Sequence, residues 1–183
     1  TVNVSSSTST VSFTSSIDST YNSYLFKFID IHPASEYGHL QFQADTGTNT
    51  NYNQTITSTS WTATNNEGDT EAIINYQTGS DQGQGTAFQY ISDQLEADND
   101  SCLAGTLHIF NPSSTTFVKH FIAKTHFHQA DPSARTYFVA GYINTTTAIT
   151  RFQFKILGTS GGAGNSNTID FGTIKMYGVG PKQ

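Results

Sequence analysis

Polar and apolar side chains alternate without a break in Arg151-Phe152-Gln153-Phe154-Lys155-Ile156. Successive side chains of a β-strand point to opposite faces, so this alternation places Phe152, Phe154 and Ile156 together on one face. The charged and amide side chains share the other face. The stretch therefore predicts an amphipathic strand that covers a core on one side and meets water on the other.

The same period of two recurs along the chain, and no window of helical length carries a 3.6-residue apolar stripe. Proline-containing turns such as Asn111-Pro112 interrupt the runs, because proline cannot donate to a strand ladder. The strands predicted in this way are 11–13, 24–31, 40–45, 52–61, 71–76, 86–91, 103–109, 117–128, 137–143, 148–157 and 169–179. We expect an all-β fold, a single antiparallel β-sandwich of the jelly-roll kind.

Three of these strands carry predictions about which face is covered. Residues 24–31 are apolar on both faces, which predicts a central strand covered on both sides. The second apolar face there consists of Leu25, Ile29 and Ile31. Residues 40–45 predict one face in water, made of Gln41, Gln43 and Asp45. In 117–128, the side chains expected to point into the core are Phe117, Phe121, Ala123 and Phe127.

The length of 183 residues fits one domain. Residues 1–10 are expected to form a Ser/Thr-rich arm or a first strand, residues 11–179 the sandwich, and residues 180–183 a short tail. The Gly-rich and Ser-rich residues 158–167 predict a flexible loop.

The chain carries 14 acidic and 8 basic residues, a net charge of -6. An acidic surface repels phosphate backbones and anionic lipid, so no nucleic-acid or membrane partner is expected. No apolar run approaches the roughly 20 residues that cross a bilayer. Thr1 is not followed by the basic and apolar regions of a secretory signal, which favours assembly in a cytoplasm.

Histidines suggest the first candidate site. His126 and His128 have the spacing that puts two imidazoles on one face of a strand, and His120 lies on that face too. No Glu follows them, however, and the favoured interpretation is a polar strand face, with a metal site as the alternative. Glu96, Asp98 and Asp100 could hold Ca²⁺ but lack the rest of an EF-hand loop, so a solvated turn is favoured. No cofactor is expected.

Catalytic motifs are not recognisable. The chain has no Gly-x-Ser-x-Gly elbow, and its Gly-rich run 79–85 lacks the Lys-Ser/Thr of a phosphate loop. Cys102 is alone, so it is expected to be a small buried side chain. We therefore expect a protein that is not an enzyme. Aromatic residues near turns, Tyr21, Trp61 and Tyr90 among them, could instead stack on a sugar or anchor a protein partner.

Several strings resemble small β-rich virion proteins of tailed bacteriophages, marine ones especially. The likeness covers about 11–179, and its strings lie at 17–21, 24–28, 31–33, 111–114, 138–142 and 172–178. The resemblance implies a non-enzymatic structural protein of the virion, assembled in the bacterial cytoplasm.

Two placements on the particle remain open. The first is a capsid decoration or cement protein, bound to the major capsid protein on the outside of the head. The second is a tail-fibre or receptor-binding module that contacts tail proteins and a host surface glycan. Exposed sheet edges and the symmetry common among virion proteins favour a homo-oligomer, and we expect a trimer.

Overall fold

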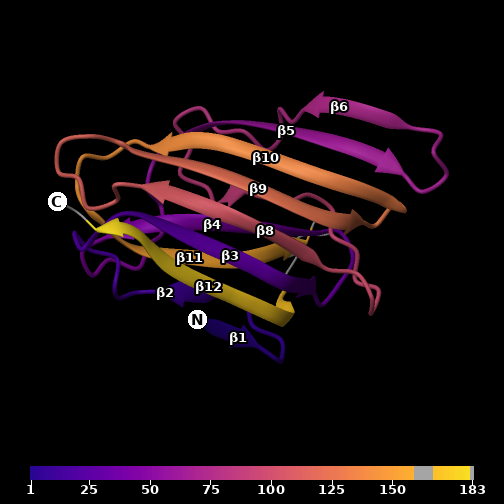
Figure 1. The fold of residues 1–183 in the computed structure, drawn as a ribbon, viewed down its shortest axis with the longest axis horizontal. Coiled ribbons are helices and arrows are strands. Elements are labelled where there is room, and N and C mark those ends of the chain that lie inside the picture. Colours follow the sequence, from indigo (N-terminus) through magenta and orange to yellow (C-terminus); the bar gives the residue numbers. More distant parts are fainter. Residues whose placement is uncertain (159–166, 182–183) are drawn as a thin grey trace.

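The computed structural model describes residues 1–158 and 167–181. These residues form twelve strands and no helix (Figure 1). The strands are β1 (Val2–Val4), β2 (Val11–Phe13), β3 (Tyr21–Pro33), β4 (Gly38–Thr46), β5 (Ile56–Asn66), β6 (Ala72–Tyr76), β7 (Gln89–Tyr90), β8 (Leu103–Phe110), β9 (Lys119–Gln129), β10 (Ser133–Ile143), β11 (Ile149–Gly158) and β12 (Ile169–Pro181). The predicted all-β class is confirmed.

The strands lie in two antiparallel sheets of unequal size, which confirms the β-sandwich. The large sheet has eight strands in the order β1-β12-β3-β8-β9-β10-β5-β6, and the small sheet has four in the order β2-β11-β4-β7. In Figure 1 the large sheet runs from β1 at the bottom to β6 at the top, with β4 and β11 behind it. The jelly-roll connectivity within this class stays a prediction.

Aromatic rings join the two sheets. Phe26 of β3 makes edge-to-face contacts with Phe13, Phe152 and Phe154 of the small sheet, with ring centroids 5.2, 5.3 and 5.1 Å away. Each such pair contributes about 1 kcal/mol beyond the burial of its surface. The predicted inward face of β11 is thus the centre of the core.

The prediction that residues 24–31 are covered on both sides is wrong. Phe26 and Phe28 are buried, but Lys27 and Ile29 are exposed on the opposite face. Ile31 is buried because a bulge between Phe28 and Ile31 shifts the alternation by one residue. One face of β3 is therefore open to solvent.

The polar face of β4 is also corrected, since Gln41, Gln43 and Asp45 are buried rather than in water. The Gln43 amide donates to the carbonyls of Gln54, Thr86 and Ala87 at 2.9 to 3.2 Å. Asp45 accepts a bond from the backbone N–H of Tyr52 at 2.9 Å. The long connections around β5 and β7 thus cover this face and satisfy the polar groups of Gln43 and Asp45.

Other differences concern strand ends. The strand expected at 52–61 begins at Ile56 and continues to Asn66, and the one expected at 86–91 is reduced to β7. Phe117 precedes β9 and is exposed instead of pointing into the core. Residues 2–4 form β1 against β12. The expected loop at 158–167, apart from its two ends, and the last two residues of the expected tail lie outside the described residues.

Truncating a ring of the core cluster tests this packing. Phe26→Ala should lower the free energy of unfolding by about 3–5 kcal/mol, because it removes the edge-to-face contacts and leaves a cavity. Phe117→Ala is the matched control, since its ring is 69% exposed, and should change stability by at most about 0.5 kcal/mol. Urea denaturation measures both, and equal effects would contradict the assigned core.

Candidate functional site

The face of the large sheet that points away from the small sheet carries exposed apolar side chains. We call it the outer face. Its large apolar residues are Ile29, Trp61, Ile122, Phe138 and Tyr177. Because they sit on several neighbouring strands, they form a broad surface rather than isolated exposed positions.

One line of directly opposite residues crosses this face. Each residue of this line lies directly opposite the next one on the neighbouring strand. From β6 to β12 the residues are Tyr76, Trp61, Phe138, Lys124, Thr106, Lys27 and Lys175. We call this set the cross-strand row. It begins with aromatic residues on β6, β5 and β10 and ends with lysines on β9, β3 and β12.

The aromatic end of the row is a stack. The Trp61 and Phe138 rings lie 4.0 Å apart at an interplanar angle of 12°, and the Lys124 ammonium lies 5.3 Å from the Phe138 centroid. The two rings and the lysine stem thus form a compact apolar patch on the outer face. Such a patch suits contact with an apolar protein surface.

The basic end concentrates positive charge on an acidic protein. Lys27 and Lys175 lie directly opposite each other on β3 and β12, although the chain has only 8 basic residues and a net charge of -6. Like charges in directly opposite positions are unfavourable. Carboxylates of a partner placed over this pair would therefore be attracted to it.

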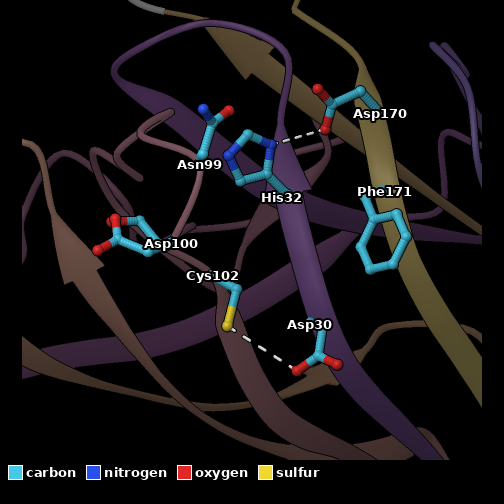
Figure 2. Close-up of a pocket in the computed structure, with 8 residues that line it drawn as sticks. Asp30, His32, Asn99, Asp100, Cys102, Asp170 and Phe171 are labelled. Carbon is cyan, nitrogen blue, oxygen red and sulfur yellow. Dashed lines mark hydrogen bonds and ion pairs between the residues drawn. The ribbon is translucent and has the colours of Figure 1, made fainter.

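A second region is an acidic pocket of about 480 Å³ (Figure 2). Figure 2 shows side chains from β3 and β12 on one side and from the segment before β8 on the other. The lining residues are Asp30, His32, Asn99, Asp100, Ser101, Cys102, Asp170 and Phe171. The pocket thus combines carboxylate and amide groups with a phenyl ring that is 57% exposed.

Paired irregularities in β3 and β12 shape this pocket. Asp30 has a φ of 53°, and Gly172 in the neighbouring strand has a φ of 126°. A Cβ at Gly172 would come within 2.6 Å of the Asp30 carbonyl oxygen, so only glycine fits there. The bulge that buries Ile31 also leaves Asp30 exposed at the pocket.

His32 ties the two sides of the pocket together. Its Nδ1 lies 2.7 Å from Asp170 Oδ1, and its Nε2 lies 3.1 Å from the Asp98 carbonyl oxygen. The two ring nitrogens therefore contact two different segments, β12 and the segment before β8. His32 thereby fastens the segment 96–102 to β12.

His128 holds the same segment from its other end. Its Nδ1 contacts the Glu96 carboxylate, and its Nε2 lies 3.1 Å from Glu67 Oε1. Burial opposes the charged ring, but the hydrogen bonds to Glu96 and Glu67 outweigh it and raise the pKa of His128. Burial likewise opposes the Glu96 carboxylate, but the bonds from Ser101 and His128 lower the pKa of Glu96. The two histidines form a clamp on 96–102.

The chemistry of the pocket is that of recognition. Partial desolvation and the neighbouring Asp30 carboxylate raise the pKa of Cys102, which keeps the thiol protonated and weakly nucleophilic. Carboxylate and amide oxygens accept hydrogen bonds from hydroxyl groups, and an exposed ring packs against apolar ligand surface. The arrangement suits a hydroxyl-rich ligand. Cys102 is exposed rather than buried, against the expectation from sequence.

The histidines singled out from the sequence share a face of β9 but have separate partners. His126 bonds the Thr136 hydroxyl at 3.1 Å, His120 packs edge-on against Tyr142, and His128 belongs to the clamp. Within residues 1–158 and 167–181, no group of three His, Cys, Asp or Glu side chains could hold a metal ion. Of the acidic residues weighed as calcium ligands against a solvated turn, Glu96 contacts His128 while Asp100 lines the pocket.

The three aromatic residues expected to mediate binding lie in different places. Trp61 belongs to the cross-strand row. Tyr21 opens β3 and packs edge-on against Tyr24, whereas Tyr90 lies in β7 against His39. They come from β3 and β5, which are separated by three strands of the large sheet, and from the small sheet, so the fold does not gather them into one surface.

Sequence reasoning did not find the pairs that build the clamp. His32 and Asp170 are 138 positions apart, and Glu67 and His128 are 61 apart. No local pattern links such residues. The sequence analysis named His128 and Glu96 as candidate ligands, but it did not pair them with each other.

Comparison with protein-family models, with curated proteins and with solved structures found no match to this chain. No helix among the described residues could span a membrane.

The clamp predicts a pH-dependent stability. The pKa of His128 is raised above its ordinary 6.5, so its contribution is fully present below pH 6.5 and is lost as the pH rises through the folded-state value. The stability lost in His128→Gln should therefore shrink as the pH rises from about 6 to about 9. Urea denaturation across this range measures it.

His126→Gln is the control, because His126 bonds a hydroxyl group. Both variants are measured over the same range, and the change with pH in His128→Gln should exceed that in the control. A loss for His128→Gln that grows with pH would contradict the clamp.

Proposed function

We propose that this chain is a non-enzymatic structural protein of a bacteriophage particle that decorates the outside of the head. The observation that carries the proposal is the cross-strand row on the outer face. It offers an apolar strip and a line of lysines on one open sheet face. The sequence resemblance to virion proteins supports the same role.

The outer face suits attachment to a protein surface. Ile122 and the stacked Trp61 and Phe138 rings supply apolar contact, and such aromatic anchors contribute most of the energy at interfaces. Lys27, Lys124 and Lys175 supply charges that orient an acidic partner. The partner expected from this chemistry is a capsid surface with apolar patches and carboxylates.

Charge reversal on the outer face tests the attachment. Particles of the encoding phage that lack the protein are mixed with purified chain and sedimented. The double variant Lys27→Glu with Lys124→Glu should bind at least about tenfold more weakly than the natural chain, because it replaces attraction to carboxylates by repulsion.

Lys155→Glu is the matched control. Its ammonium lies over the Phe88 ring and belongs to the small sheet, so particle binding should persist. Natural chain that fails to sediment with the particles, or equal losses in both variants, would refute attachment through the outer face.

A glycan-binding module of a tail fibre is the second candidate, and the acidic pocket favours it. Asp30, Asp100 and Asp170 can accept bonds from sugar hydroxyls, and the exposed Phe171 ring offers an apolar platform. This candidate places recognition at the pocket rather than at Trp61.

Two exposed phenylalanines separate this candidate from the first. If the pocket binds a glycan, Phe171→Ala should weaken binding to glycans of the host surface by roughly tenfold, while Phe117→Ala leaves it unchanged. Glycan-array titration measures both variants. Absence of glycan binding by the natural chain removes the second candidate and leaves the first standing.

A further inference from the structure

The edge strand β6 differs from the other sheet edges. β1 and β2 have three residues each and β7 has two, whereas β6 has five, all of them exposed. Short edge strands are a common protection against pairing with another chain. β6 lacks this protection, and it contains neither a charged residue nor a proline. Figure 1 shows it at the upper border of the large sheet.

The hydrogen-bond pattern shows which backbone groups of β6 are open. At its two ends, Glu71 accepts from the Asn66 N–H at 3.1 Å and the Gln77 N–H donates to Ser60 at 2.9 Å. In an antiparallel ladder, alternate residues face the same partner strand. The N–H and C=O groups of Ala72, Ile74 and Tyr76 therefore point to the free side.

These open positions are symmetric about Ile74. If a second β6 is placed antiparallel with Ile74 opposite Ile74, Ala72 lies opposite Tyr76, and every open N–H and C=O group finds a partner. The flanking charges agree with this register, because Glu71 lies opposite the Gln77 amide and not opposite another acid. An edge that is complementary to itself in backbone and in charge fits a second copy of the same chain.

We propose that β6 pairs with β6 of a second copy of this chain around a two-fold axis at Ile74. The pairing joins two eight-stranded sheets into one continuous sheet. A two-fold axis between antiparallel strands stands perpendicular to the sheet, so both outer faces lie on the same side. The contact does not depend on the virion role, and it replaces the trimer expected from sequence by a dimer.

Light scattering of the purified chain tests this contact with two matched substitutions. The natural chain should have twice the mass of the 19.9 kDa monomer. Ile74→Lys should be monomeric, because it places two ammonium groups opposite each other on the axis. Ile122→Lys, on the same sheet but away from the edge, should remain dimeric. Ile74 and Ile122 are 72% and 52% exposed, so both variants should fold, as circular dichroism will verify.

Mixing oppositely charged variants tests the register. Ile74→Lys and Ile74→Glu should each be monomeric alone and should restore the dimer mass when combined, because residue 74 faces residue 74. A monomeric natural chain, a three-copy mass, a dimer that persists in Ile74→Lys, or a mixture that stays monomeric would each overturn the proposal.

Discussion

Unequal sheet width is the constraint on which the rest of this structure depends. Four strands cannot cover one whole face of an eight-stranded sheet, and the apolar core between the sheets extends from Val4 of β1 to Ile56 of β5 without reaching β6. Near β5 the cover consists of β7 and the connection before it, and the contacts become polar. Ser58 donates to the Gln89 side chain at 2.7 Å, and Gln89 in turn donates to the Ser80 carbonyl at 2.8 Å. Beyond this network β6 has no such cover, and its side chains and outer backbone groups stay exposed.

Because of the unequal sheet width, the groups that stabilise the fold differ from those that are exposed on the outer face. Apolar area between the sheets and hydrogen-bonded amides under the connections stabilise the fold, which leaves the outer face free to carry Trp61, Ile122 and the lysines. The acidic pocket arises where β3 and β12 depart from regular pairing, at Asp30 and Gly172. Hydrogen bonds hold its geometry, because His32 and His128 fix the segment that presents Asn99 and Asp100. The groups exposed on the outer face and in the pocket are thus separate from those that form the core.

The sequence predicted the burial of strand faces where local alternation determines it. It did not predict burial or contacts that depend on segments distant in the chain. Phe152 and Phe154 were placed correctly, since period two is a property of neighbouring residues. Gln41, Gln43 and Asp45 have the same pattern, yet all three are buried, and Gln43 bonds Thr86, which is 43 positions away in the chain. The clamp was missed for the same reason, as its carboxylates come from other segments than its imidazoles. The bulge at Asp30 interrupts the alternation in β3. It could not be predicted, because no proline or glycine marks that point of the strand.

Electron cryomicroscopy of the assembled phage particle tests the central claim most directly, that this sandwich works through the open surfaces of its large sheet. The account predicts density for the chain on the outside of the head, with the outer face against the capsid and neighbouring copies meeting edge to edge at β6. Density on the tail, or copies on the head that contact the capsid through the small sheet, would contradict it.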